Sequence, residues 1–255
     1  MTLDLRALLD LETIDVDLYR ASAVFPEDYP LYGGQVAGQA LRAAGHTVDA
    51  DRVPHSLHGY FLRPGDSSRP TVFRVSRDRD GRSFSARRVV AVQNGEVIFN
   101  LVCSFHRPAG GPHEQVPVMP GVVPPEQLES QPLPRLFSFE GRFPQQPYAE
   151  RAELPTRFWA RAVVDLGDDP LLHACALTYL SDVSSGVLPA ADGSARSRAS
   201  IDHSLWLHGP VNLNDWVLTD YQPRATGFGR GVYNGTIYAR DGRLVASIAQ
   251  ETIYR

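Results

Sequence analysis

The chain has 255 residues, of which 43% are apolar, so it can bury a core and is not disordered as a whole. Its 25 basic and 29 acidic residues give a net charge of -4, which argues against a polyanion-binding surface, and we expect no nucleic acid partner. All 25 basic residues are arginine, which excludes Schiff-base chemistry on a lysine and a Walker-type phosphate loop.

No apolar run approaches the roughly 20 residues of a membrane helix, so we expect no membrane insertion. Residues 1–14 alternate acidic and apolar side chains without a basic start, which is not the pattern of a signal peptide. The two cysteines, Cys103 and Cys175, lie in apolar runs and are interpreted as buried thiols rather than a disulfide or a zinc site. We therefore expect a soluble, cytoplasmic protein with neither a metal nor a cofactor.

The first predicted element is a helix over residues 33–46, which consists mainly of Gly and Ala. The glycines are poor by helix propensity, so the helix makes sense only if a sheet closes tightly around it. Strand-like stretches rich in Val and Phe follow at residues 70–75, 87–92 and 97–102. Asn94-Gly95 between the last two predicts a tight hairpin, and therefore antiparallel neighbours.

A proline-rich segment comes next, because ten of the 20 prolines fall between Pro108 and Pro147. Proline lacks the N–H that a central strand needs and interrupts a helix, so this segment can be neither. We interpret residues 108–150 as a linker, an extended crossing between two sheets that is partly ordered on the surface. It separates two predicted domains, residues 1–107 and 151–255.

The second half repeats the order of the first. Asp169-Pro170 is a good N-cap and first position for an apolar helix that reaches Leu180. Strand-like stretches follow, and Asp241-Gly242 gives a second hairpin signal. The offset between the halves is 148 (203 minus 55) for the His-Ser-Leu strings and 147 (242 minus 95) for the hairpin glycines. We predict an α+β fold of two antiparallel sheets, each wrapping a central helix, which is a double hotdog.

Several common signatures of chemistry are missing from the sequence. It contains no Gly-x-Ser-x-Gly elbow, no His-Glu-x-x-His and no Cys-x-x-Cys, so an α/β-hydrolase serine and a catalytic zinc are unsupported. The string from Gly227 to Gly231 faintly resembles a dinucleotide loop, but it lacks the last glycine spacing and a following helix. We interpret it as a bulged strand.

Three polar residues of the second half are candidates for function. Asp182 follows an apolar helix, where the negative end of the helix dipole disfavours a carboxylate, so it is either solvated or held for use. Gln250 lies in an apolar strand and is either a satisfied core amide or a functional one. Ser200 precedes Asp202-His203, but neighbours on a strand face opposite ways, which disfavours a Ser–His–Asp triad.

Four strings carry a resemblance to a known family. They are His55-Ser-Leu-His-Gly-Tyr-Phe-Leu-Arg-Pro-Gly-Asp66, Asp80-Gly-Arg-Ser-Phe-Ser85, Ile201-Asp-His-Ser-Leu-Trp206 and the segment from Asp241 to Glu251. Together they resemble the type II acyl-CoA thioesterase family, from about Leu3 to the C-terminus, with the linker least alike. The resemblance implies a double hotdog fold and hydrolysis of fatty acyl-CoA to free fatty acid and CoA.

The resemblance also implies a catalytic trio. In that family an Asp after the second central helix, a Thr or Ser before the Asp-His-Ser string and the Gln of the last strand bind the attacking water. By similarity these roles fall on Asp182, Ser200 and Gln250. The carboxylate suits a general base, and the hydroxyl and amide can orient a water.

The oxyanion of the reaction needs a separate hydrogen-bond donor. We expect backbone N–H groups at the start of the first helix, near Gly33, Gly34 and Gln35, since glycine lets a substrate approach the backbone. Two departures from the family stand out, namely Gly209 in place of an Arg and Thr252 in place of a Gly. Residues 183–199 are also shortened, and we expect these changes to affect phosphate contacts or chain-length preference.

Two alternatives remain open at this point, because a fold does not imply a reaction. The chain could be a non-catalytic acyl-CoA binding hotdog protein, or a hotdog hydratase that uses His58 or His203, although neither histidine has a persuasive partner in sequence. In each case acyl-CoA is the expected ligand. We also expect a homodimer or a higher homo-oligomer.

Overall fold

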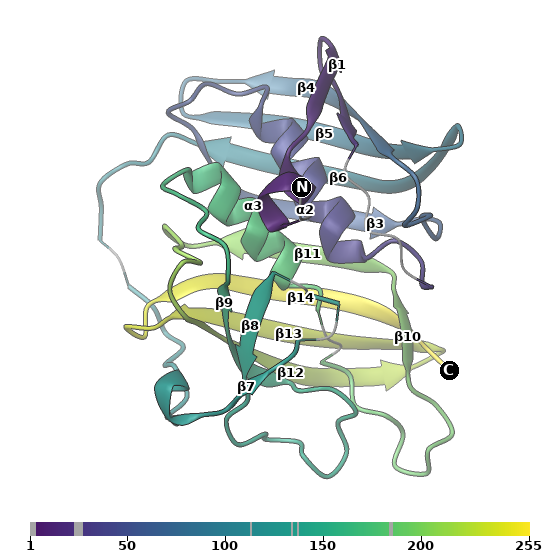
Figure 1. Ribbon diagram of the computed structural model, residues 1–255, viewed down its shortest axis with the longest axis vertical. Helices are drawn as coiled ribbons and strands as arrows, with labels where there is room; N and C mark the ends of the chain where they lie inside the picture. The colour runs from purple at the N-terminus through teal and green to yellow at the C-terminus, as the bar shows by residue number, and fades with distance from the viewer. Residues whose placement is uncertain (1–3, 23–27, 113, 134, 137, 184–185) are drawn as a thin grey trace. The chain divides into compact units, whose positions relative to one another are not determined.

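In the computed structural model the chain forms two compact units (Figure 1). The structure describes residues 4–22, 28–112, 114–133, 135–136, 138–183 and 186–255. The first unit comprises Met1–Pro112 together with Asp168–Leu180, and the second comprises His113–Gly167 together with Ser181–Arg255. Among the described residues, no helix is both long enough and apolar enough to cross a membrane.

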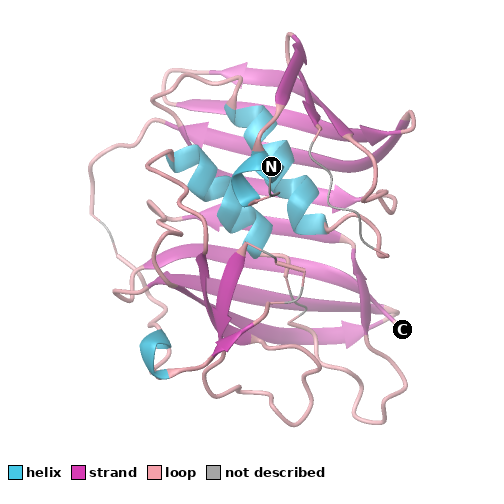
Figure 2. Ribbon diagram, viewed as in Figure 1, coloured by secondary structure: helices cyan, strands magenta, loops and turns pink. Residues whose placement is uncertain are grey.

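The first unit combines helices with an antiparallel sheet (Figure 2). Its elements in chain order are α1 (Leu5–Leu9), β1 (Glu12–Asp15), β2 (Leu18–Ala21), α2 (Gly33–Gly45), β3 (Val53–Phe61), β4 (Thr71–Asp80), β5 (Phe84–Gln93), β6 (Glu96–His106) and α3 (Pro170–Leu180). The strands lie in the order β1-β2-β4-β5-β6-β3, and each neighbouring pair is antiparallel.

Helix α2 packs against both this sheet and α3, and it is buried on nearly all sides, as its composition predicts. A Cβ atom at Gly34 would lie 2.3 Å from the carbonyl oxygen of Tyr179, and one at Gly38 would lie 2.8 Å from that of Cys175. Glycine is therefore needed where the two helix backbones approach each other. The second predicted helix begins at Pro170 after the Asp169 cap, whose carboxylate accepts the N–H of Leu171 at 2.9 Å.

The second unit is dominated by its sheet (Figure 2). Its elements in chain order are the 3-10 helix η1 (Pro125–Gln127), β7 (Ser130–Gln131), β8 (Phe139–Arg142), β9 (Arg157–Ala162), β10 (Ser197–Ser200), β11 (Asp202–Leu207), β12 (Val217–Gly227), β13 (Arg230–Ala239) and β14 (Leu244–Tyr254). The strands lie in the order β11-β14-β13-β12-β9-β8-β7, and β10 also pairs with β14.

The predicted repeat is confirmed by the strand order. The order β4-β5-β6-β3 in the first unit matches β12-β13-β14-β11 in the second. Asn94 and Gly95 form the expected two-residue turn, with φ of 51° and 80°. The hairpin at Asp241 differs, because only Gly242 has a positive φ, of 90°, and the Asp241 carboxylate accepts the N–H of Arg243.

The interpretation of the string from Gly227 to Gly231 as a bulged strand is wrong. Gly227 pairs with Arg230, and Phe228 and Gly229 between them have φ of 52° and 76°. Two successive positive φ angles define a tight turn that matches the right-handed twist of the flanking strands. The string is therefore the turn that joins β12 to β13.

The proline-rich segment is more regular than the sequence predicts. Strand β8 pairs with β9 near the edge of the second sheet, in a stretch without proline. The side chain of Gln115 accepts the N–H of Leu244 at 2.7 Å and donates to the carbonyl of Gly242 at 3.0 Å. The segment is thus tied to the β13–β14 hairpin by hydrogen bonds.

Candidate functional site

The three predicted site residues of the second unit converge. The Ser200 hydroxyl donates to Asp182 Oδ1 at 3.1 Å, and the Gln250 amide donates to the same oxygen at 2.9 Å. The Gln250 amide nitrogen also donates to Ser200 Oγ at 2.7 Å. Gln250 is buried, whereas Asp182 and Ser200 are half-buried, so the cluster is partly accessible to solvent.

Strand pairing explains why residues so far apart in sequence meet. Ser200 is the last residue of β10, and it pairs with Thr252 of β14. Side chains two positions apart on a strand share a face, so Gln250 lies on the same face as Thr252. Asp182 follows two residues after the end of α3, at the point where the chain enters the second unit.

A fourth residue, His203, belongs to this cluster. Its ring is fully buried, its Nε2 lies 2.7 Å from Ser181 Oγ, and its Nδ1 hydrogen-bonds to Gln250 Oε1. The sequence alone does not show this contact, because it depends on the register that sets β11 beside β14. Asp202 accepts the N–H of Glu251 at 2.7 Å, so it faces away from His203, as strand alternation predicts.

Two tyrosines form an apolar wall next to this cluster. Burial raises the pKa of both Tyr221 and Tyr233, and the nearby Asp182 carboxylate raises the pKa values further. The Tyr221 hydroxyl donates to the carbonyl of Ser181 at 2.8 Å, which anchors the backbone next to Asp182. A Cβ atom at Gly186 would lie 2.6 Å from the Tyr233 ring, so Gly186 packs directly against this wall. Neutral phenols and little water strengthen the electrostatic interactions of the carboxylate.

The predicted oxyanion donors lie at the start of α2, in the first unit. Tyr32 is the N-cap, and Gly33, Gly34 and Gln35 form the first turn. The Gln35 N–H contacts the carbonyl of Tyr32 at 3.1 Å. A Cβ atom at Gly34 would lie 2.3 Å from the carbonyl oxygen of Tyr179, so packing against α3 also requires glycine at this position.

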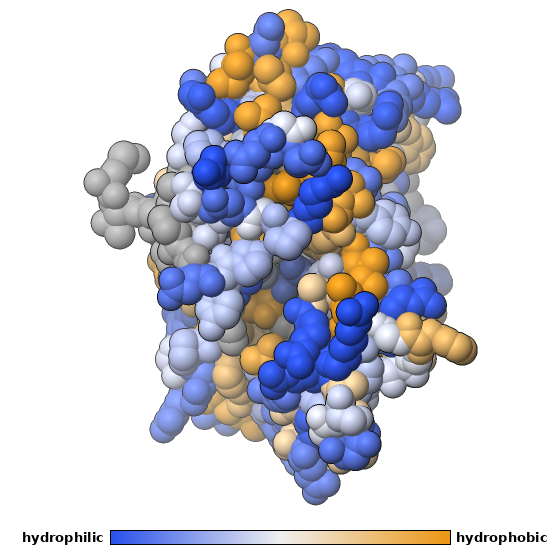
Figure 3. All heavy atoms as spheres, turned by 90° about the vertical axis from the view of Figure 1, so that its right-hand side faces the viewer, coloured by the Kyte–Doolittle hydropathy of each residue, from blue (hydrophilic) through white to orange (hydrophobic). Residues whose placement is uncertain are grey.

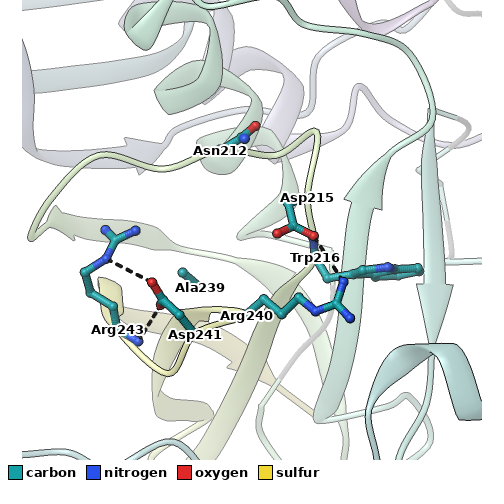
Figure 4. A pocket seen from close by; sticks show the side chains of 7 residues that line it. All are labelled: Asn212, Asp215, Trp216, Ala239, Arg240, Asp241 and Arg243. Carbon is teal, nitrogen blue, oxygen red and sulfur yellow. Dashed lines mark hydrogen bonds and ion pairs between the residues drawn. The ribbon is translucent and has the colours of Figure 1, made fainter.

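A separate hollow in the second unit has a volume of about 510 Å³ (Figure 4). Its lining residues are Asn212, Asp215, Trp216, Ala239, Arg240, Asp241 and Arg243. Ion pairs hold both arginines, Arg240 with Glu126 at 2.6 Å and Arg243 with Asp241 at 3.8 Å. Arg243 lies just before β14, whose residues from Leu244 to Gln250 span about 20 Å at the usual rise of a strand. The hollow is therefore not part of the cluster around Asp182.

The two cysteines are buried free thiols, as predicted. Burial raises the pKa of Cys103 to about 12 and raises the pKa of Cys175 as well, so both are protonated and unreactive at neutral pH. In the described part of the chain, no group of three or more His, Cys, Asp or Glu residues is arranged to hold a metal ion.

The chain is similar to known proteins over nearly its whole length. Human acyl-coenzyme A thioesterase 8 is 34% identical over 97% of this chain and 88% of its own length. A crystal structure of an acyl-CoA thioesterase II from Mycobacterium marinum has a TM-score of 0.82 at 39% identity and covers 98% of both chains.

The fold is also shown by a more distant structure. A protein of unknown function with a hot dog fold from Alicyclobacillus acidocaldarius has a TM-score of 0.81 at 19% identity, with 100% of this chain and 99% of that chain covered. Family models match both halves: residues 22–106 match the acyl-CoA thioesterase N-terminal domain, and residues 113–254 match the C-terminal domain. The chain therefore belongs to the acyl-CoA thioesterase family, as the four sequence strings predict.

Proposed function

We propose that this protein hydrolyses the thioester of fatty acyl-CoA, with a single water held by Asp182, Ser200 and Gln250. Family membership supports the reaction. The observation that carries the mechanism is the set of three short contacts among these side chains, at 3.1, 2.9 and 2.7 Å.

The chemistry follows from the residue types. The Asp182 carboxylate takes a proton from the water, while the Ser200 hydroxyl and the Gln250 amide fix the direction of its lone pair. The water oxygen bonds to the thioester carbonyl carbon and gives a tetrahedral intermediate. When the intermediate collapses, the C–S bond breaks, and the CoA thiolate takes the proton that Asp182 holds. The products are the free acid and CoA, and the carboxylate is restored.

The negative oxygen of that intermediate needs its own donors. We assign this role to backbone N–H groups near Gly33, Gly34 and Gln35, at the start of α2. The Gln35 N–H already contacts the Tyr32 carbonyl, so Gly33 and Gly34 are the leading donors. The positive end of the α2 dipole would add to their effect.

A thiol-release assay over short to long acyl-CoA chains tests the proposal. We expect Asp182→Asn to lower kcat by about 100-fold or more, since general-base catalysis contributes at least that much. Circular dichroism serves as the folding control, and the buried thiols of Cys103 and Cys175 add no background to the assay. Wild-type kcat in this variant would show that another group is the base. Measurable CoA-ester affinity without thiol release would favour a binding protein instead.

Three finer points belong to the same proposal. We infer a double hotdog, and the repeated strand order supports it. In sequence we divide it into domains at residues 1–107 and 151–255 joined by the linker 108–150, whereas in the structure Asp168–Leu180 clusters with the first unit and His113–Gly167 with the second. We also infer a cytoplasmic homo-oligomer. Tyr60 and Val102, which are 55% and 51% exposed, offer an apolar surface on the first sheet. Figure 3 shows the face on the right-hand side of Figure 1, where hydrophobic residues lie among hydrophilic ones.

A further inference from the structure

We propose that His203 is a positioning residue, which fixes the orientation of the Gln250 amide and through it the geometry at Asp182 and Ser200. This inference rests on the proposed hydrolysis. It assigns His203 neither the role of a triad member nor that of a hydratase base. His203 acts on the reaction through Gln250.

The donors and acceptors around Gln250 leave one consistent arrangement. Its Nε2 donates to Asp182 Oδ1 at 2.9 Å and to Ser200 Oγ at 2.7 Å. Its Oε1 must then accept from the partner on the other side, which is His203 Nδ1. A carbonyl oxygen has no proton to give, so Nδ1 carries the hydrogen of this bond.

The other ring nitrogen extends the same chain of bonds. In a neutral ring with Nδ1 protonated, Nε2 is an acceptor, and the Ser181 hydroxyl donates to it at 2.7 Å. Ser181, His203 and Gln250 are all buried, so little water competes for these bonds. The Tyr221 hydroxyl holds the Ser181 carbonyl at 2.8 Å, which keeps the start of the chain in place.

The catalytic cycle explains why this orientation needs support. A primary amide has nearly the same shape after a half turn, which exchanges its oxygen and nitrogen. While Asp182 is ionised, the turned amide would place Oε1 against a carboxylate oxygen, which is unfavourable. Once Asp182 holds the proton from water, it can donate to an amide oxygen, and this obstacle disappears. The N–H of His203 still opposes the turn, so the Asp182 proton stays available for the leaving thiolate.

Two variants of His203 with side chains of similar size distinguish a positioning role from a purely structural one. His203→Asn places an amide N–H close to the position of Nδ1 and can still donate to Gln250. His203→Gln places its amide near the position of Nε2, so it can keep the contact with Ser181 but not the donor to Gln250. We expect His203→Gln to lower kcat about 100-fold, as for other small misplacements of a reacting group, with KM little changed. His203→Asn should stay within about tenfold of the wild type.

A matched control comes from a second His–Ser pair, between the residue that follows β11 and a residue of β14. His208 Nε2 lies 2.8 Å from Ser247 Oγ, and His208 is exposed, so His208→Gln should leave kcat unchanged. Equal losses of kcat in His203→Asn and His203→Gln would overturn the positioning role.

Two further measurements separate this inference from the hydrolytic proposal. Wild-type turnover and its loss in Asp182→Asn test the hydrolysis alone. The ¹⁵N shifts of the His203 ring test the bond pattern without any turnover, and we expect Nδ1 protonated and Nε2 unprotonated. The opposite tautomer would overturn the inference. If the His203 variants do not fold, Ser181→Ala replaces them. We expect this variant to show a mixture of His203 ring tautomers and a kcat about tenfold lower. An unchanged tautomer together with wild-type kcat would contradict the inference.

Discussion

The Ser200 hydroxyl is used in two directions at once. It accepts a hydrogen bond from Gln250 Nε2 and donates one to Asp182 Oδ1. A hydroxyl can do both because it carries one proton and two lone pairs. The residue therefore couples the base to the amide, and a replacement must preserve both capacities.

Substitutions at Ser200 test this coupling. We expect Ser200→Ala to lower kcat by about 10- to 100-fold, since one oriented group is lost near the water. Ser200→Thr keeps the hydroxyl and should stay within a few-fold of the wild type by the same reasoning. Steady-state kinetics on one acyl-CoA gives both values. Equal kinetics in the Ala and Thr variants would show that the hydroxyl has no part in the reaction.

The sequence predicts the trio but not its neighbour. Asp182 and Gln250 have ordinary structural interpretations when each is taken alone, and only the family strings join them to Ser200. The role of His203 is not predicted, because its partner on the adjacent strand is set by the pairing of β11 with β14. A register of this kind is a tertiary property, so local patterns of apolar and polar residues do not determine it.

At the scale of elements, the tight turn that joins β5 to β6 and the one that joins β12 to β13 differ in the residue at their first position. Asn94 and Phe228 occupy the same position of two-residue turns, with φ of 51° and 52°. Asn tolerates this left-handed conformation, whereas a Phe side chain is strained in it. Phe228 is fully exposed, so it gains no burial in return.

We expect Phe228→Asn to stabilise the protein by about 1 kcal/mol, which is the usual cost of a left-handed residue. The reverse change, Asn94→Phe, should destabilise by at least as much, because it also removes a hydrogen bond from Arg69 at 2.8 Å. Urea denaturation measures both changes. A loss of stability in Phe228→Asn would contradict the argument from strain.

A buried arginine ties β5 to the end of α2. Arg87 is 1% exposed, donates to Thr47 Oγ1 at 2.7 Å and pairs with the half-exposed Asp80 at 2.6 Å. The Ser85 hydroxyl and the Arg87 guanidinium hold the pKa of Asp80 below its usual range. Asp80 therefore stabilises the fold above the pKa of 3.8 that it has unfolded, and this contribution is lost as the pH falls through the lower folded pKa.

A comparison with a surface pair isolates this contribution. Asp80→Ala should cost about 1–2 kcal/mol at pH 7, since hydrogen bonds to a charged group are strong but Asp80 is partly screened by water. Asp78→Ala should cost at most about 0.5 kcal/mol, because its partner Arg88 is exposed. Denaturation at pH 7 and pH 3 checks the sign, and the cost of Asp80→Ala should shrink at the lower pH.

Elements with a strong local signal are the ones that the sequence predicts well. The helix after Asp169 and the Asn94-Gly95 turn both have a cap or turn residue with a defined conformation. Strand β8 is missed because the prolines around it suggest an irregular segment, although none lies within Phe139–Arg142. Helix α1 is also missed, since five residues capped by Asp4 carry too little periodicity.

For the whole molecule, the repeat raises the question of how many sites a chain contains. Asp182 lies two residues after the end of α3, and the residue two after the end of α2 is Thr47, which is engaged by Arg87. Gln250 lies eight residues after Gly242, and the residue eight after Gly95 is Cys103, whose buried thiol is protonated. The first half thus lacks the acid and the amide that define the cluster in the second half.

We therefore expect one acyl-CoA site per chain. Calorimetric titration with a thioether analogue, which cannot be hydrolysed, should give a stoichiometry close to one. Asp182→Asn should lower kcat by about 100-fold or more on every acyl chain length, and not merely by half. A stoichiometry of two, or half of the activity remaining, would point to a second working site in the first half.

The path of the chain between the units has a practical consequence. Helix α3 follows the linker in sequence, yet Asp168–Leu180 clusters with Met1–Pro112, and its backbone fills the space that Gly34 and Gly38 leave open. A gene fragment that stops in the linker would omit this helix and leave those glycines facing solvent. A chimera that exchanges the N-terminal half between relatives must therefore transplant residues 168–180 along with it.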